Sequence, residues 1–281
     1  MRIGCHVSIS GGIEKAPRRA ADFGCECFQI FTRSPRGGNP PEIEKSAAQK
    51  FRSERKRLGL ADCYVHTPYI INLASANPEL RKKSVDMVAR DLERAEAVGA
   101  AAVVTHIGTA AGSGRKEATE KAAASLREIT AAARGIKARL LIENSAGQGA
   151  TLGSAFEEIA RILDKAGADT GVCLDTAHLF GAGYELRSPE GFEETVRSIK
   201  ATFSPGRVGL VHCNDSKVEK GSRKDRHEHI GLGTIGTEGF ETVMASGVFD
   251  KVDFIVETPP SGSAADVKKL KNIRRKTSRS I

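Results

Sequence analysis

Histidine and carboxylate side chains recur where short apolar segments of this sequence end. Six segment ends and four residues that follow them form the candidate set: His66, His106, Glu143, Asp175, His212 and Glu257, then His178, Asp225, His227 and His229. Six of the seven histidines belong to this set, and the seventh, His6, ends the first apolar segment. Such side chains are the usual ligands of divalent metals.

A lone histidine of this kind is usually a satisfied core residue, and a lone carboxylate is often a helix cap. A cluster is different, because neighbouring carboxylates repel one another and buried charges need compensation. Imidazole and carboxylate without thiolate suit zinc, manganese or iron. The set is larger than one ion can use, so it predicts two or three cations, with a bridging carboxylate and an open position for water.

Clustered divalent cations commonly serve phosphodiester hydrolysis, since one ion activates water and others hold the attacked phosphate. A nuclease or a phosphatase is therefore the predicted class of enzyme. The first alternative is a sugar isomerase or epimerase, which uses one or two metals on a barrel scaffold and usually has fewer histidines. The second is a DNA-binding protein without catalysis, which no recognition-helix motif supports.

The apolar segments that position these residues have the length and composition of buried parallel strands. Eight are predicted: Arg2–His6, Cys27–Phe31, Asp62–His66, Ala102–His106, Arg139–Glu143, Thr170–Asp175, Val208–His212 and Phe254–Glu257. Eight strands that alternate with helices predict a (β/α)₈ TIM barrel, whose strands end on one catalytic face. A doubly wound open sheet is the alternative.

Helical periodicity fills the intervals between the strands. The predicted helices are Pro78–Val98, Lys116–Arg134, Ser154–Lys165, Pro189–Ala201 and Glu238–Ser246. Asn77 and Ser188 each precede a proline and are predicted N-caps, and Gly99 is a predicted helix stop. No linker divides the chain, so we expect one domain over residues 1–265 and a basic C-terminal tail over residues 266–281.

The charge balance favours an anionic partner. Lys and Arg number 43 against 35 Asp and Glu, a net charge of +8 with a pI near 9.2, which points to nucleic acid first. Tryptophan is absent and aromatics are 5%, which argues against a stacking platform for single strands. The tail is either a solvated, frayed end or a phosphate-binding arm; its basic residues are Lys268, Lys269, Lys271, Arg274, Arg275, Lys276 and Arg279.

Other features define the expected compartment and exclude some cofactors. No apolar run approaches the roughly 18 residues of a membrane span, and Met1–His6 holds no apolar signal segment, so we expect a cytoplasmic protein away from membranes.

The six cysteines form no C-x-x-C pair and are expected to be free thiols. The G-x-G-x-x-G run from Gly231 to Gly236 follows charged residues and predicts a turn before a helix, with anion-binding amides, and no dinucleotide site.

Several motifs in order along the chain resemble those of the endonuclease IV family. They are Gly4-Cys5-His6-Val7-Ser8, His66-Thr67-Pro68-Tyr69, Thr105-His106-Ile107-Gly108, Ile142-Glu143-Asn144, Asp175-Thr176-Ala177-His178, Val211-His212-Cys213-Asn214-Asp215, Asp225-Arg226-His227 and Glu257-Thr258-Pro259. A sister family that acts on UV-damaged DNA and the sugar isomerases share the scaffold. The H-T-P-Y and D-T-A-H motifs favour endonuclease IV.

The resemblance implies a class II apurinic/apyrimidinic endonuclease (deoxyribonuclease IV) of base excision repair. Such enzymes cut double-stranded DNA 5′ to an abasic site, leave a 3′-hydroxyl and a 5′-deoxyribose phosphate, and trim blocked 3′ ends. We expect a monomer without a nucleotide cofactor.

The family pattern also implies roles for individual residues. Three zinc ions are expected, with Mn²⁺ or Fe²⁺ as alternatives: one held by His66, His106 and Glu143, one by Glu143, Asp175, His212 and Glu257, and one by His178, Asp225 and His227. Glu143 would also be the catalytic residue. Arg36 and Tyr69 match positions that enter DNA at the lesion. Two departures stand out, since His229 falls outside the ligand motif and residues 34–38 lack the bulkier side chains of many relatives.

Overall fold

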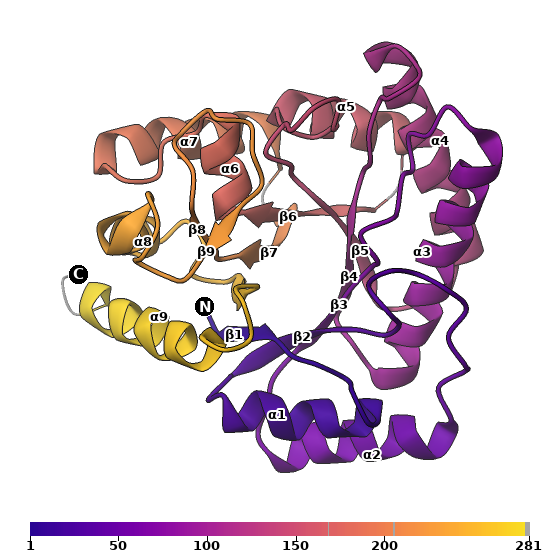
Figure 1. Cartoon of the computed structure of the whole chain (residues 1–281), viewed down its shortest axis with the longest axis horizontal. Helices are drawn as coiled ribbons and strands as arrows, with labels where there is room; N and C mark the ends of the chain where they lie inside the picture. The colour runs from indigo at the N-terminus through magenta and orange to yellow at the C-terminus, as the bar shows by residue number, and fades with distance from the viewer. Residues whose placement is uncertain (168, 205, 279–281) are drawn as a thin grey trace.

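Eight parallel strands close into a barrel in this computed structural model, which describes residues 1–167, 169–204 and 206–278 (Figure 1). They are β1 (Ile3–His6), β2 (Cys27–Phe31), β3 (Cys63–His66), β4 (Ala102–His106), β5 (Arg139–Glu143), β6 (Gly171–Asp175), β7 (Val208–His212) and β10 (Asp253–Val256). The order around the barrel is β1-β10-β7-β6-β5-β4-β3-β2. The predicted TIM barrel is confirmed, with every strand end within one residue of its predicted position, and the open-sheet alternative is excluded.

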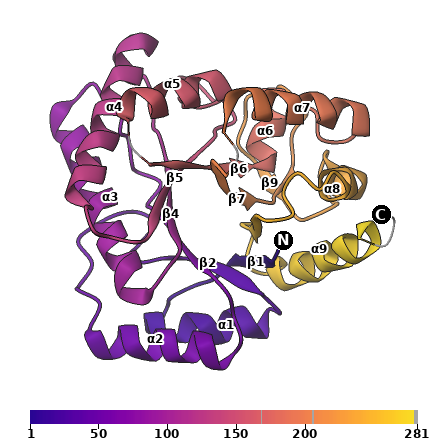
Figure 2. The same cartoon turned by 180° about the vertical axis from the view of Figure 1, so that it is seen from behind.

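Helices cover the outside of the barrel, as the two opposite views show (Figures 1 and 2). They are η1 (Ile13–Lys15), α1 (Ala16–Asp22), α2 (Lys45–Arg57), α3 (Pro78–Val98), α4 (Arg115–Ala132), α5 (Phe156–Ala166), α6 (Thr176–Ala182), α7 (Pro189–Thr202), α8 (Gly236–Ala245) and α9 (Ser263–Thr277). The five predicted helices are present with ends shifted by at most two residues.

The predicted caps explain where α3 and α7 begin and where α3 ends. The Asn77 side chain accepts hydrogen bonds from the backbone N–H groups of Glu79 and Leu80, and the Ser188 hydroxyl accepts one from Gly191. These bonds satisfy N–H groups that have no partner inside the helix. Gly99 ends α3 in the left-handed conformation, at φ 67°.

Two cores hold the fold together. The larger one lies between the strands and the helices. The smaller one is formed by inward-facing strand residues: Cys27, Tyr64, Ala102, Val104, Leu141, Cys173, Leu210 and Ile255. Because this layer fills the barrel interior, a polar site can lie only above it, at the carboxyl ends of the strands.

Helix α9 crosses residue 265, where the sequence predicted a boundary with a basic tail. Val267, Leu270 and Ile273 are buried in the larger core, so residues 266–277 belong to the outer layer of the barrel. Arg274 binds the carboxylate of Glu26 through two nitrogens, at 2.8 and 2.9 Å, and donates to the backbone oxygen of Met1. The basic end of α9 therefore lies beside the N-terminus (Figure 1), away from the carboxyl ends of the strands. Arg279 is outside the described residues.

A small antiparallel pair, β8 (Asp215–Ser216) and β9 (His227–Glu228), follows β7. All six cysteines are buried free thiols, as predicted. Within the described ranges, no helix has the length and apolar character needed to cross a membrane.

Candidate metal centre

The alternation of side chains along the strands aims the candidate residues into the mouth of the barrel. Residues two apart on a strand face the same side, and each candidate at a strand end lies two positions beyond a residue of the inner core. The pairs are Tyr64 and His66, Val104 and His106, Leu141 and Glu143, Cys173 and Asp175, Leu210 and His212, and Ile255 and Glu257. A ring of imidazoles and carboxylates therefore stands directly above an apolar floor.

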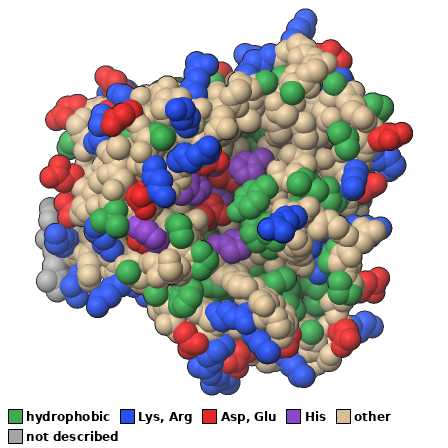
Figure 3. Space-filling view, viewed as in Figure 1, with side chains coloured by type: hydrophobic (Ala, Val, Ile, Leu, Met, Phe, Trp, Pro, Cys, Tyr) green, Lys and Arg blue, Asp and Glu red, His purple; other side chains and the backbone are tan. Residues whose placement is uncertain are grey.

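The structure brings all nine predicted ligand residues together. Potential ligand atoms lie within 4.8 Å of one another in four overlapping groups: His66, His106 and Glu143; His66, His212 and Glu257; Glu143, Asp175, His212 and Glu257; and Asp175, His178 and His227. Asp225 joins the last group, with its carboxylate oxygens 3.1 Å from His178 Nε2 and 3.3 Å from His227 Nε2. The central histidine and carboxylate side chains gather at the middle of one face, with Lys and Arg side chains around it (Figure 3).

Glu143 lies at the centre of this arrangement and is buried. One carboxylate oxygen is 3.1 Å from His66 Nε2 and 3.6 Å from His106 Nε2. The other oxygen is 3.2 Å from His178 Nδ1 and 3.2 Å from His212 Nδ1. A carboxylate with each oxygen directed to a different pair of imidazoles has the disposition of a bridging ligand.

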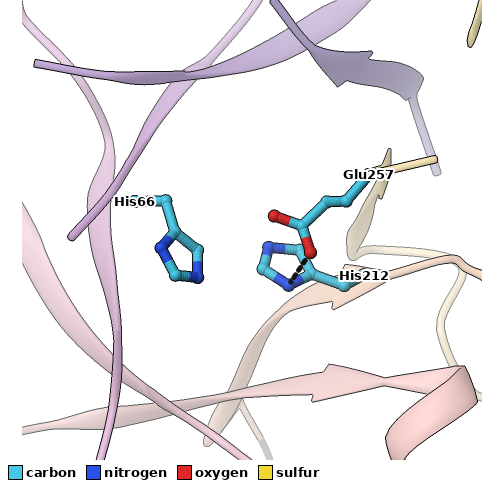
Figure 4. Close-up of side chains that lie close together, drawn as sticks. All are labelled: His66, His212 and Glu257. Carbon is cyan, nitrogen blue, oxygen red and sulfur yellow. Dashed lines mark ion pairs between the residues drawn. The ribbon is translucent and has the colours of Figure 1, made fainter. Parts of the chain in front are cut away.

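A close-up of three members shows how the site converges (Figure 4). His66 from β3 faces His212 from β7 across a gap, and the carboxylate of Glu257, which follows β10, points to His212. The distance from His212 Nδ1 to Glu257 Oε2 is 3.0 Å.

The electrostatics of this group fit bound cations. Burial opposes ionisation of Glu143, yet the imidazoles of His106, His212 and His178 hold the pKa of its carboxyl well below the usual range. Burial also opposes a charge on His178, but Asp175, Asp225 and Glu143 raise its pKa well above the usual value. In the absence of a cation, protonated imidazoles must therefore balance the carboxylates. Metal ligands must be deprotonated, so a divalent cation would replace those protons.

Two buried ring nitrogens without a hydrogen-bond partner in the described part of the chain also fit cation binding. Among the described residues, His212 Nδ1 and His227 Nε2 are buried and have no hydrogen-bond partner. Buried polar atoms are normally paired, so each unpaired one needs an explanation. Both nitrogens belong to predicted ligands and face carboxylate oxygens, and a cation between them would satisfy both sides.

Backbone oxygens orient two of the imidazoles. His66 Nδ1 lies 2.6 Å from the backbone oxygen of Thr67, and His178 Nδ1 lies 3.0 Å from that of Asn144. Each Nδ1 can donate its proton there, which leaves Nε2 free as a ligand atom. His229 is placed differently: its Nδ1 is 2.7 Å from Asp266 of α9, away from the nine.

Asn214 supports the carboxylates, a role that the sequence analysis missed. Its side-chain N–H donates to Asp175 Oδ2 at 2.6 Å, and its side-chain oxygen accepts the backbone N–H of Glu257 at 2.8 Å. The sequence feature that could have indicated this role is the place of Asn214 within the Val211–Asp215 motif, two residues after the strand-end histidine His212.

Asp215 and the glycine-rich loop form a second arrangement that the sequence analysis missed in part. The loop was predicted to bind an anion through its backbone amides. In the structure these amides bind a carboxylate of the same chain: the buried Asp215 side chain accepts N–H bonds from Gly231, Gly233, Ile235 and Gly236. It also accepts the N–H of Ser216. A Cβ atom on Gly233 would lie 2.4 Å from the backbone oxygen of Ser216, so this close approach requires glycine.

Tyr69 and Arg36, the predicted DNA-binding residues, lie on two loops that contact each other beside the ligands. The Tyr69 backbone N–H donates to the Pro35 oxygen at 3.3 Å, and a Cβ on Gly37 would meet Ile70 at 2.4 Å. The Tyr69 ring is 63% exposed, although it stands 5.8 Å from the His66 ring. The small residues around Arg36 thus allow the two loops to pack together.

Comparison with known proteins gives consistent matches over nearly the whole chain. The family model described as "Xylose isomerase-like TIM barrel" matches residues 17–275. Proteins named "Probable endonuclease 4" are 41% identical in Aquifex aeolicus, over 91% of each chain, and 37% identical in Methanoculleus marisnigri, over 97% of each chain.

Comparison with solved structures gives the same family. The crystal structure of endonuclease IV from Thermus thermophilus superposes with a TM-score of 0.88 at 33% identity, covering 98% of this chain and 100% of that one. A D-tagatose 3-epimerase-like protein reaches a TM-score of 0.77 at 20% identity, covering 100% and 99%, which is a likeness of fold alone.

Proposed function

The chain belongs to the endonuclease IV family of xylose isomerase-like TIM barrels, and from this membership we propose that it cleaves the phosphodiester bond 5′ to abasic sites in double-stranded DNA. The products would be a 3′-hydroxyl and a 5′-deoxyribose phosphate, and the same site would trim blocked 3′ ends in base excision repair. The observation that carries the proposal is the position of Glu143 between four imidazoles, within a group of eight potential ligands that Asp225 extends to nine.

The residues present fit three divalent cations, and we propose zinc, with Mn²⁺ or Fe²⁺ as alternatives. His66, His106 and Glu143 would hold one ion; Glu143, Asp175, His212 and Glu257 a second; and His178, Asp225 and His227 a third. Bound ions of this kind polarise phosphate oxygens and lower the pKa of water. Imidazole and carboxylate ligands without thiolate suit all three metals.

The protein residues have separate tasks in the proposed reaction. Glu143 bridges two ligand groups and offers a carboxylate oxygen that can take a proton from the attacking water. His106, His227 and Glu257 are partly exposed and Asp225 is exposed, so this side of the group faces an incoming phosphate. The β8–β9 connection adds Arg223, Lys224 and Arg226, all exposed, which attract the DNA backbone. The proposal needs one chain and no nucleotide cofactor.

Incision of a defined duplex tests the proposed function. We expect the purified protein, supplied with zinc, to cut a duplex that contains one abasic site 5′ to the lesion and to leave the matched intact duplex uncut. Prolonged chelation should abolish the cut, and added zinc should restore it. Turnover of a ketose together with an uncut abasic duplex would instead establish the sugar epimerase alternative.

Tyr69→Ala is expected to weaken capture of abasic duplex. Base stacking on aromatic side chains contributes roughly 1–3 kcal/mol in other proteins, so the dissociation constant should rise about 5- to 150-fold. Metal content and hydrolysis of a small phosphodiester should stay unchanged. Fluorescence anisotropy and the two cleavage assays provide the measurement, with Tyr69→Phe as the control that keeps the ring. Equal loss on both substrates would show that Tyr69 only packs the loop against His66.

A further inference from the structure

Gln29 stands in the ring of predicted ligands on β2, a strand that contributes no predicted ligand. It lies two residues beyond Cys27 of the inner core and is fully buried. Its amide nitrogen is 2.6 Å from Glu257 Oε1 and 3.1 Å from His6 Nδ1. Its amide oxygen is 2.9 Å from His212 Nε2. One uncharged side chain thus contacts two predicted ligands and the seventh histidine.

The contacts determine which way the amide points. An ionised carboxylate only accepts hydrogen bonds, whereas an amide nitrogen only donates. The nitrogen of Gln29 must therefore face Glu257, and its second hydrogen is directed to His6 Nδ1, which accepts it. The amide oxygen then faces His212, so His212 Nε2 must carry a hydrogen and donate it.

This hydrogen bond decides the ligand atom of His212. With Nε2 engaged by Gln29, the remaining nitrogen, Nδ1, lies 3.2 Å from Glu143 Oε1 and 3.0 Å from Glu257 Oε2. The same amide holds Glu257 Oε1, which leaves Oε2 as the oxygen beside His212 Nδ1. His66 and His178 obtain the equivalent bond from backbone oxygens, but His212 obtains it from the side chain of a different strand.

We propose that Gln29 is a positioning residue for the second cation site: it selects the His212 tautomer, aims one oxygen of Glu257 and so sets the affinity of that site. The proposal rests on the metal-dependent function proposed above. Partners of this kind, which contact ligands but not the metal, change metal affinity by about 10- to 100-fold when they are replaced. His6 belongs to the same hydrogen-bond network, because its Nδ1 accepts the second amide hydrogen of Gln29. This contact explains why a histidine ends β1.

Gln29→Met tests the proposal, because methionine keeps the length of the side chain and removes both hydrogen-bonding functions. We expect an affinity lower by about 10- to 100-fold for one of the bound zinc ions, measured by competition with a chromophoric chelator. The other ions should bind as in the wild type, and excess zinc should restore most of the incision. Thr195→Val on α7, a buried exchange of similar shape away from the ligands, controls for general loss of packing.

A measurement on the zinc-loaded wild type, in which one ring nitrogen of His212 must be free to bind the metal, keeps the proposal testable if Gln29→Met does not fold. Selective ¹⁵N labelling of histidine reports the protonation of each ring nitrogen, and we expect His212 Nε2 to carry a hydrogen. A His212 protonated at Nδ1 alone would overturn the proposal, as would unchanged zinc affinity in folded Gln29→Met. If the wild type binds no zinc and cuts no abasic DNA, the proposed function has failed instead.

Discussion

Glu143→Gln is expected to abolish incision of abasic duplex, with a loss of about 10³-fold or more, while the duplex still binds. The substitution keeps the shape of the side chain and removes its charge. An amide cannot direct an anionic oxygen to each of two imidazole pairs, and it cannot take a proton from water. General base catalysis alone contributes about 10²- to 10⁴-fold, and the loss of the proposed bridging ligand would add to that effect.

Thermal melting and incision, measured on the same sample, separate this role from a structural one. Glu158→Gln is the matched control, because Glu158 is also a buried glutamate but pairs with Arg115 on the outer helices. The control should lose stability and keep its activity per folded molecule. If Glu143→Gln instead melts early and retains incision in proportion to its folded fraction, Glu143 is a structural residue.

Asp215→Ala is expected to lower the free energy of unfolding by at least about 3 kcal/mol, since each buried N–H left without a partner costs roughly 1–3 kcal/mol. Five backbone N–H groups donate to this carboxylate, four of them from the glycine-rich loop. The same loop follows β9, which carries the predicted ligand His227. We therefore expect weaker metal binding together with the loss of stability.

Urea unfolding of the metal-free and zinc-loaded forms measures both effects. Asp215→Asn retains one acceptor oxygen and should lose less stability than Asp215→Ala. Asp250→Ala, an exchange of an exposed aspartate, should change the unfolding free energy little. A loss below about 1 kcal/mol in Asp215→Ala, in the range of an ordinary exposed hydrogen bond, would contradict the proposed support of the loop.

The strands could be predicted from the sequence because each is a short apolar run with a clear end, such as Ala102–His106. Four α-helices were not predicted: α1 and α6, which have only seven residues each, and the longer α2 and α9. In α2 only Ala48 and Phe51 are buried among 13 residues, so its apolar period is too faint to detect. In α9 the lysines and arginines conceal the spacing of Val267, Leu270 and Ile273, and the segment was taken for a tail.

The clustering of the strand-end ligands could also be predicted, because strand alternation and a parallel barrel bring strand-end side chains to one mouth, whereas the separation of His229 from the nine predicted ligands rested on the family motif. The residues that position these ligands could not be predicted. Gln29 contacts His212 across 183 positions of sequence, and an amide carries no charge that marks it. The glycine-rich loop could be recognised in the sequence. The carboxylate that its amides bind could not, because Asp215 lies on β8, 16 positions before Gly231.

The metal content of the active protein tests the central claim most directly. Inductively coupled plasma mass spectrometry should find about three divalent ions per chain, as the three proposed ligand groups require, in the same preparation that cuts abasic duplex. Brief EDTA treatment should remove few of them if the ions are enclosed. One ion or fewer per chain in a fully active preparation would contradict the proposed trinuclear centre.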